Sequence, residues 1–206
     1  MTAAIILAAG RSTRMGQPKP LLRYEALAGH TFVSHLVEVF KTSSFTEILV
    51  VGRPDDDGLR AEVARCEATF IENRRPDEGQ LSSLLAALNH LNFRKDTQVE
   101  AVLVTPVDAP LISTAVVARL MRAAAASPAQ IIRATHAGKH GHPVIFRRST
   151  FDELYAADLT VGARAVVRAD PGRVEEVDME DEGVTIDFDT PEEYRRYFGT
   201  PPSTNR

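Results

Sequence analysis

A regular alternation of short apolar runs with stretches of helical periodicity constrains this chain more than any other feature. Strand-like runs lie at residues 3–9, 47–52, 68–73 and 101–108, and helix-like stretches lie at 32–43, 58–66, 79–91 and 113–127. This alternation favours a parallel sheet, because each right-handed crossover carries a helix back over one face of the sheet. We therefore expect an α/β fold with a mostly parallel central sheet and helices on both faces.

The alternation changes after about residue 130. Strand-like runs at 130–135 and 142–148 flank a Gly/His-rich turn region, and two short helices follow. Two further strand-like runs, 173–179 and 184–189, are separated by an acidic turn. The sequence TPEEYRRYFG predicts a last helix, with a Thr N-cap, a Pro at the first position, a capping-box Glu and a Gly after its end.

Charge and composition exclude several classes of protein. The net charge of −4 argues against binding to nucleic acid or to an anionic membrane, since both need a basic face. There is no apolar run of about 18 residues and no signal-peptide pattern, so we expect no membrane span. The single Cys66 excludes an internal disulfide and fits the reducing cytoplasm, which is the expected location.

Glycines and cations are concentrated directly after the first strand-like run. The stretch LAAGRSTRMGQPKPLL, residues 7–22, contains Gly10, Gly16, Arg14 and Lys19. Ligands of open α/β sheets bind outside the carboxyl ends of the strands, and glycine amides beside fixed cations suit an anion. The spacing matches neither the dinucleotide fingerprint nor the Walker loop. We expect this loop to bind a triphosphate; the alternative is a surface loop with solvated cations.

Carboxylates occur at two places where they would reach the same edge of the sheet. Asp108 ends the run 101–108, and Asp187 and Asp189 lie in the run 184–189, where positions i and i+2 of a strand share a face. One or two carboxylates together with phosphate oxygens are the usual ligands of Mg²⁺. The alternatives are an Asx turn at Asp108 and a supporting role for Asp189 at the start of the last helix.

The stretch 7–22 resembles the signature L-A-[AG]-G-x-S-x-R-M-G-x-x-K-x-L-L of the MobA-like NTP transferase family, and within it the molybdenum cofactor cytidylyltransferases. The resemblance implies a three-layer Rossmann-like nucleotidyltransferase fold. It also implies a single domain over 1–199, with an NTP-binding half of about 1–110, an acceptor-binding half of about 111–199, and a flexible tail over 200–206.

The same resemblance implies roles for individual residues. Arg14 would pair with a phosphate and Lys19 would lie on the α-phosphate, both as catalytic groups with Asp108. Asp108 and Asp189 would be the magnesium ligands, with Asp187 as the second choice, although Val107 replaces the family's usual glycine. The nucleotide-binding positions implied by the resemblance are Leu7, Ala8, Ala9, Gly10, Arg11, Ser12, Gly16, Asn73, Gly79 and Ser83.

Two segments of the second half resemble the acceptor-binding part of the family. GKHGHPVIF matches at Gly141 and Pro143 and includes His142, and TVGARAVV matches at Arg164, although Leu159–Thr160 replaces the usual Gly-Asp. The neighbouring histidines are not expected to bind zinc, because no Cys or carboxylate completes a tetrahedral set at a suitable spacing. For residues 73–83, an ordinary helix cap with plain serines is an equal alternative.

The resemblance implies a magnesium-dependent nucleotidyltransferase that uses a nucleoside triphosphate. CTP is the favoured donor, because LAAG rather than LAGG is typical of the cytidylyl branch, and molybdopterin or another phosphate compound is the acceptor. A molybdoenzyme would be a transient partner. The alternatives are a GTP-using guanylyltransferase, a sugar- or polyol-phosphate nucleotidyltransferase, and a non-catalytic nucleotide-binding module.

Overall fold

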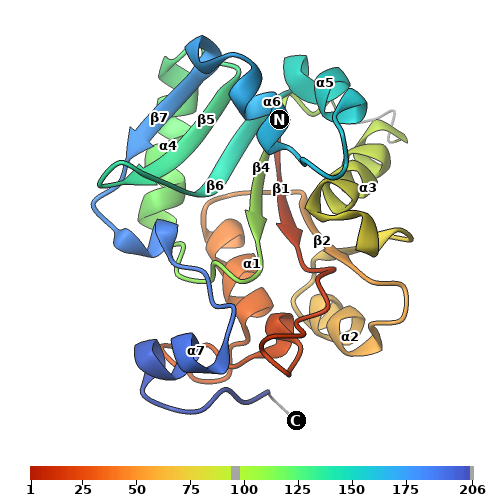
Figure 1. Ribbon diagram of the computed structural model, residues 1–206, viewed down its shortest axis with the longest axis vertical. Coiled ribbons are helices and arrows are strands. Elements are labelled where there is room, and N and C mark those ends of the chain that lie inside the picture. The colour runs from red at the N-terminus through yellow and green to blue at the C-terminus, as the bar shows by residue number, and fades with distance from the viewer. Residues whose placement is uncertain (94–97, 205–206) are drawn as a thin grey trace.

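A seven-stranded sheet with the order β3-β2-β1-β4-β6-β5-β7 forms the centre of the computed structural model, which describes residues 1–93 and 98–204 (Figure 1). β6 runs antiparallel to β4 and β5, while every other neighbouring pair is parallel. The predicted mostly parallel sheet is therefore confirmed. The strands are β1 (Thr2–Leu7), β2 (Ile48–Gly52), β3 (Thr69–Glu72), β4 (Ala101–Pro106), β5 (Ile131–His136), β6 (Lys139–Arg147) and β7 (Val174–Asp178).

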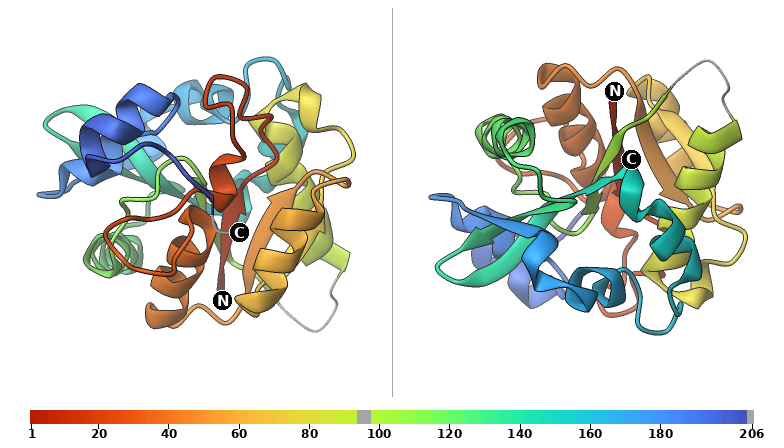
Figure 2. Two further views of the ribbon diagram at one scale, coloured as in Figure 1. Left: turned by 90° about the horizontal axis from the view of Figure 1, so that it is seen from below. Right: turned by 90° about the horizontal axis from the view of Figure 1, so that it is seen from above.

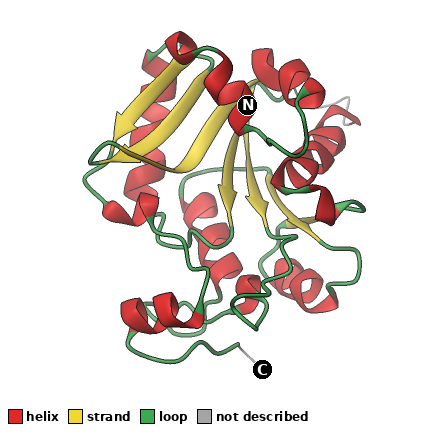
Figure 3. Cartoon of the chain, viewed as in Figure 1, coloured by secondary structure: helices red, strands yellow, loops and turns green. Residues whose placement is uncertain are grey.

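Helices cover both faces of this sheet, as the sequence predicts (Figures 2 and 3). One core contains side chains from α1 (Phe32–Thr42), α2 (Asp57–Arg65), α4 (Thr114–Ala126) and α7 (Pro191–Phe198). The other contains side chains from α3 (Gln80–Phe93), α5 (Phe151–Ala156) and α6 (Arg164–Ala169). None of the described helices is long and apolar enough to cross a lipid bilayer.

β1 shows why its sequence reads as a continuous apolar run. Ala4 and Ile6 point into the first core, and Ala3 and Ile5 point into the second; all four are fully buried. A strand that is covered on both faces needs apolar residues at odd and even positions. Each buried isoleucine contributes roughly 1.5–3 kcal/mol of transfer free energy, so this strand anchors both layers.

The register of β1 and β4 sets the position of the candidate site. The two strands are parallel and pair Leu7 with Pro106, and the Val107 amide donates a hydrogen bond to the Leu7 carbonyl at 3.0 Å. The glycine loop and Asp108 therefore leave the sheet side by side at its carboxyl edge. Val107 does not have a positive φ. The backbone at this position therefore does not require the glycine that is usual in the family.

Two local predictions are wrong. Residues 184–189 do not form a strand: a 3₁₀ turn spans Glu182–Thr185, because Asp181 accepts a hydrogen bond from the Gly183 amide at 2.9 Å and starts the turn. The Gly/His-rich region 136–142 is mostly strand, since β5 and β6 extend into it and leave only a tight turn at residues 137–138.

The end of the chain is held to the beginning. α7 starts with the predicted capping box of Thr190 and Glu193 and ends at Gly199 in the left-handed conformation. Beyond it, the segment predicted as a flexible tail contacts the loop after β1: Gln17 Nε2 donates to the Pro202 carbonyl at 3.0 Å, and the Arg23 amide donates to the Ser203 carbonyl at 2.9 Å. Residues 205–206 lie outside the described part.

Candidate active site

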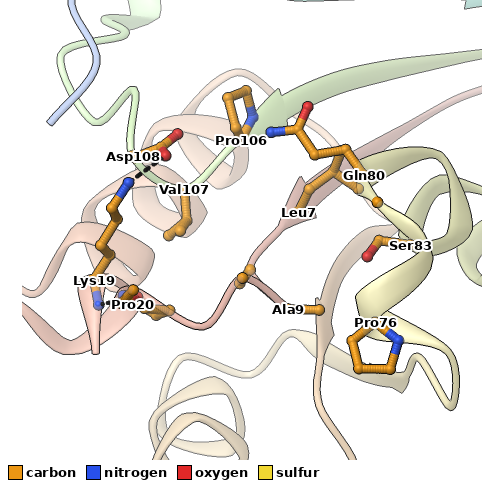
Figure 4. A pocket seen from close by; sticks show the side chains of 14 residues that line it. Leu7, Ala9, Lys19, Pro20, Pro76, Gln80, Ser83, Pro106, Val107 and Asp108 are labelled. Carbon is orange, nitrogen blue, oxygen red and sulfur yellow. Dashed lines mark hydrogen bonds and ion pairs between the residues drawn. The ribbon is translucent and has the colours of Figure 1, made fainter. Parts of the chain in front are cut away.

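Four side chains from three distant parts of the chain meet at the carboxyl edge of the sheet. Lys19 Nζ lies 2.7 Å from Asp108 Oδ2 and 2.6 Å from Asp189 Oδ1, and Arg14 Nη2 lies 3.0 Å from Asp189 Oδ2 (Figure 4 shows the Lys19–Asp108 pair). Burial acts to lower the pKa of Lys19, but the two carboxylates together outweigh it and raise the pKa. Lys19 is therefore a fixed cation between two anions.

The loop conformation places Lys19 there. Ser12 has a φ of 53°, a left-handed conformation that is unfavourable for a side-chain-bearing residue and concentrates at functional sites. From this position its carbonyl accepts from the Gly16 amide at 3.0 Å, and its hydroxyl accepts from the Lys19 amide at 3.1 Å. The short 3₁₀ turn Lys19–Leu21 follows. The loop thus folds back and returns Lys19 to the end of β1.

Carboxylates outnumber cations at this point, which fits a divalent metal ion. Burial, followed by the negative charges of Asp108 and Asp189, raises the pKa of Asp187 to about 6. Among the described residues no preformed group of three metal-ligating side chains exists. A cation held by one or two carboxylates and completed by phosphate oxygens and water, as Mg²⁺ is, needs no such group. The residues present therefore fit Mg²⁺ bound together with a nucleotide.

Two cavities meet at this cluster. Lys19 and Asp108 line both a small cavity of about 210 Å³ and a large one of about 1300 Å³. The other predicted nucleotide-binding residues that line the small cavity are Leu7, Ala8, Ala9, Gly10, Ser12, Gly79 and Ser83. The remaining predicted residues that line the large cavity are Arg14, Gly141, His142, Arg164, Asp187 and Asp189. Leu7, Gly10, Ser12 and Gly79 line the large cavity as well, so the two spaces share part of their wall.

Four predicted residues line neither cavity. Arg11 forms a two-point ion pair with Asp77, with its Nε and Nη2 at 2.9 and 2.7 Å from the carboxylate oxygens. Asn73 is only 3% exposed, and its side-chain amide donates to the hydroxyls of Ser82 and Ser83. Asn73 therefore positions Ser82 and Ser83 by hydrogen bonds and does not itself line a cavity. The other two are Gly16, in the loop after β1 with a φ of 72°, and Pro143, on β6 between two residues that line the large cavity.

Gly141 acts through packing. A Cβ at this position would lie 2.2 Å from the Val184 carbonyl oxygen, so only glycine lets the chain cross β6 here. The crossing segment leads directly to Asp187 and Asp189, and the Phe188 amide donates to the Asp108 carbonyl at 2.8 Å. The close approach at Gly141 thus brings the C-terminal acidic residues next to Asp108.

Several cavity residues were missed by the sequence reasoning. Gln80, the first residue of α3, lines both cavities, and its side chain extends into the small one (Figure 4). Its position directly after Gly79 at a helix start is a signal that could have identified it. Arg133, His140, Arg168 and Glu176 line the large cavity. Arg133, Arg168 and Glu176 lie at strand or helix positions for which the sequence carries no signal, whereas His140 belongs to the Gly/His-rich region.

Comparison with known proteins identifies the family of this chain. The sequence profile of the MobA-like NTP transferase domain matches residues 4–176. The chain belongs to the MobA-like NTP transferase family. Its Rossmann-like fold is the one that the resemblance implied. The acidic segment with Asp187 and Asp189 lies beyond the matched residues.

The curated relatives of this MobA-like chain are named for different activities. It is 33% identical over 122 residues to the bifunctional protein GlmU of Francisella philomiragia, covering 59% of this chain and 25% of that protein. It is 31% identical over 132 residues to 2-C-methyl-D-erythritol 4-phosphate cytidylyltransferase of Cereibacter sphaeroides. This match covers 62% of this chain and 55% of that protein. The chain thus spans about a quarter to a half of the length of these curated relatives.

A solved structure matches the MobA-like chain almost from end to end. Rv0371c from Mycobacterium tuberculosis H37Rv is 26% identical, with a TM-score of 0.80, and the match covers 97% of this chain and 98% of that one. The likeness therefore includes the C-terminal region that lies beyond the family profile.

Proposed function

We propose that the protein is a magnesium-dependent cytidylyltransferase that transfers CMP from CTP to the phosphate of molybdopterin and releases pyrophosphate. The observation that carries the proposal is the placement of Lys19 between Asp108 and Asp189, where the two cavities meet. A nucleotide in the small cavity would present its α-phosphate there. An acceptor in the large cavity would approach the same point from the other side.

The reaction needs no nucleophile from the protein. An oxygen of the acceptor phosphate attacks the α-phosphorus, the bond from that phosphorus to the bridging oxygen breaks, and pyrophosphate leaves with the electron pair. Mg²⁺ held by Asp108 and Asp189 would neutralise charge on the phosphate oxygens. Lys19 and Arg14 stabilise the negative charge that develops around the α-phosphorus, and the loop 10–16 positions the outer phosphates.

Nucleotide binding would rearrange the ion pairs of the empty cluster. Lys19 now contacts both carboxylates, and Arg14 contacts Asp189. In the nucleotide complex, the two cations would turn to phosphate oxygens, and the metal ion would take the carboxylate oxygens that they release. One divalent cation neutralises only part of the negative charge of a triphosphate, so Lys19 and Arg14 are needed beside the remaining phosphate oxygens.

We assign recognition of the nucleotide base to one end of the small cavity, which is formed by Ala8, Gly79, Gln80 and Ser83. A carboxamide beside a hydroxyl offers both a donor and an acceptor to a base edge. We assign CTP from the LAAG form of the loop, which leaves Ala9 beside this space. Guanine is the competing base.

A polyol phosphate is the competing acceptor, since one relative is a 2-C-methyl-D-erythritol 4-phosphate cytidylyltransferase. The test is to incubate the purified protein with Mg²⁺, each NTP in turn, and either molybdopterin or 2-C-methyl-D-erythritol 4-phosphate, and to measure product masses. The proposal requires the cytosine dinucleotide of molybdopterin as the main product. A guanine dinucleotide or cytidine diphospho-methylerythritol would assign the alternative, and nucleotide binding without any product would indicate a non-catalytic module.

A further inference from the structure

Three charged side chains outside the catalytic cluster join two walls of the small cavity. Arg11 donates its Nε and Nη2 to the Asp77 carboxylate, at 2.9 and 2.7 Å. Arg53 Nη1 donates to the same carboxylate at 3.3 Å. We name Arg11, Arg53 and Asp77 the charge clasp. Its members line neither cavity, so the contacts described above give them no role in the transfer reaction.

The charge clasp spans three neighbouring strands. Arg11 follows β1, Arg53 follows β2, and Asp77 lies beyond β3 in the 3₁₀ turn Pro76–Glu78. Because β2 lies between β1 and β3 in the sheet, the Arg11–Asp77 pair bridges the end of β2. There Arg53 supplies the third charge, and its Nη1 also donates to the Ala9 carbonyl at 3.5 Å. The clasp therefore ties the loop after β1 to the connection between β3 and α3.

Both segments that the charge clasp ties together line the small cavity. Gly10 and Ser12, the chain neighbours of Arg11, lie on one side of the clasp. Pro76, which precedes Asp77, lies on the other side. A break in the clasp would thus release two walls of the same cavity from each other.

The charge clasp also supports the strained residue of the loop. Ser12 has a φ of 53°, and its hydroxyl accepts from the Lys19 amide at 3.1 Å. Such sparsely populated conformations persist only where the surrounding structure over-determines them. The hydrogen bond with Lys19 holds Ser12 from one side, and Arg11, through its pair with Asp77, holds it from the other. The two contacts together fix the backbone that returns Lys19 to the site.

The geometry makes this pair stronger than most exposed ion pairs. The side chains of Arg11 and Asp77 are 61% and 60% exposed, and isolated pairs of this kind contribute little in water and salt. A two-point guanidinium–carboxylate contact within a network of charges is the exception. Hydrogen bonds from Arg11, and less strongly from Arg53, lower the pKa of Asp77 to about 2. Its negative charge is therefore present throughout the neutral pH range.

We infer that Asp77 is a positioning residue for nucleotide binding, which holds Arg11 and Arg53 in a clasp and thereby fixes the phosphate-binding loop against the turn Pro76–Glu78. Arg11 then acts through Asp77 and does not contact the triphosphate. A loop that is ordered beforehand loses less conformational freedom on binding, so the clasp raises the affinity for the nucleotide. The inference rests on the proposed function in taking the small cavity as the nucleotide site, and it is independent of the base and of the acceptor.

The test is a double-mutant cycle for nucleotide binding, measured by isothermal titration calorimetry with Asp77→Asn, Arg11→Gln and the double variant. Mg²⁺–CTP and Mg²⁺–GTP are both titrated, so the base preference does not decide the result. We expect each single substitution to raise Kd about 3- to 5-fold, the upper range for exposed charge pairs. The double variant should bind no more weakly than Arg11→Gln alone, because either substitution already breaks the clasp.

Glu78→Gln is the matched control. It removes the same charge from the same 3₁₀ turn as Asp77→Asn does, but Glu78 pairs with Arg75 and lines neither cavity. Its Kd for both nucleotides should equal that of the unaltered protein. Equal losses in Glu78→Gln and Asp77→Asn would show that only the net charge of the turn matters, which would overturn the inference.

Salt separates an ion-pair role from a general structural one. The factor between Asp77→Asn and the unaltered protein should shrink towards one as the ionic strength rises from about 0.1 to about 1 M, because the Debye length falls from about 10 to about 3 Å. A packing defect would cost the same affinity at both ionic strengths. A factor that does not change with salt would therefore contradict an ion-pair clasp.

The sign of the Asp77→Asn effect decides between the clasp and direct phosphate binding by Arg11. If Asp77→Asn binds nucleotide as tightly as the unaltered protein or more tightly, Asp77 does not position the loop and the inference fails. Additive losses in the double variant would also overturn it, since the two residues would then act separately. Absence of nucleotide binding by the unaltered protein would overturn both the inference and the proposed function. The expected cycle without transfer to any acceptor would overturn the proposed function alone.

Discussion

Lys19 Nζ lies 2.6 Å from Asp189 Oδ1, although 170 positions separate the two residues. This contact joins the loop after the first strand to the segment before the last helix. Asp108 lies on the other side of the same ammonium group. The arrangement places a cation and two carboxylates where a divalent ion and a phosphate would exchange with them.

Removing the ammonium group should abolish most of the activity. We expect Lys19→Met to lower kcat at least about 100-fold, because a preplaced charge at a developing oxyanion contributes on the order of 10²–10³ in rate. The measurement is pyrophosphate release at saturating CTP and Mg²⁺. Lys41→Met is the matched control, since Lys41 on α1 pairs with Glu67 and lines neither cavity. Comparable rates in the two variants would remove Lys19 from the mechanism.

The three acidic residues should differ in their effect on metal dependence. We expect Asp108→Asn and Asp189→Asn each to raise the Mg²⁺ concentration for half-maximal activity at least about 10-fold, because each removes a charged oxygen ligand. Asp187→Asn should have the smaller effect, since Asp189 is the residue that Lys19 and Arg14 hold in place. A Mg²⁺ titration of pyrophosphate release separates the three. If Asp187→Asn has the largest effect, the ligand assignment must be exchanged.

Buried side chains and local patterns explain which features the sequence predicted. The two-sided burial of β1, the capping box of α7 and the position of Asp108 after β4 all follow from short-range patterns. The Arg133–Glu176 pair depends on which strands become neighbours, and no local pattern encodes that. The Arg11–Asp77 pair likewise joins segments that are distant in sequence. The 3₁₀ turn at residues 182–185 has a local cause, the Asp181 cap, which outweighs the strand-like pattern of residues 184–189.

The close approach of Gly141 to Val184 should affect both the stability of the protein and its binding of Mg²⁺. Gly141→Ala places a Cβ 2.2 Å from the Val184 carbonyl oxygen, so the segment leading to Asp189 must shift. We expect a loss of about 1–3 kcal/mol in the free energy of unfolding and weaker Mg²⁺ dependence of the CTP-induced thermal shift. Urea unfolding and thermal shift measure the two effects. If Gly141→Ala leaves the free energy of unfolding and the thermal shift unchanged, there is room for a Cβ between residue 141 and the Val184 carbonyl.

The C-terminal contacts should position the lysine loop. Tyr194 donates its hydroxyl to the Arg23 carbonyl at 2.7 Å, and residues 202–203 accept hydrogen bonds from Gln17 and Arg23. We expect a chain that ends at Thr200 to show faster amide exchange over residues 17–23 and a several-fold higher KM for CTP. A chain that ends at Thr204 keeps these contacts and is the control. Unchanged exchange in the shorter chain would remove this role from the tail.

His35 should make stability dependent on pH. Burial, with a smaller contribution from His30, lowers the pKa of His35 to about 4, and the ring stacks on Tyr24 with a centroid distance of 3.9 Å. The unfolded chain takes up this proton near pH 6.5 and the folded chain only near pH 4, so stability falls as the pH drops through this window. Between pH 7 and 5 the loss from His35 is about 2 kcal/mol.

The control for this pH effect is His35→Phe, which keeps an aromatic ring against Tyr24 and removes the titrating group. Its free energy of unfolding, from urea titrations, should fall less steeply between pH 7 and 5 than that of the unaltered protein. Equal slopes would mean that His35 can be protonated in the folded state.

The most direct measurement is a crystal structure with Mn²⁺ and a CTP analogue that resists cleavage at the α–β bond, with the metal located by its anomalous scattering. We expect one metal ion bound by Asp108 and Asp189 at about 2.1 Å, with the α-phosphate beside Lys19 and the base beside Gln80. A metal ion held elsewhere, or a nucleotide whose phosphates do not contact Lys19, would contradict it.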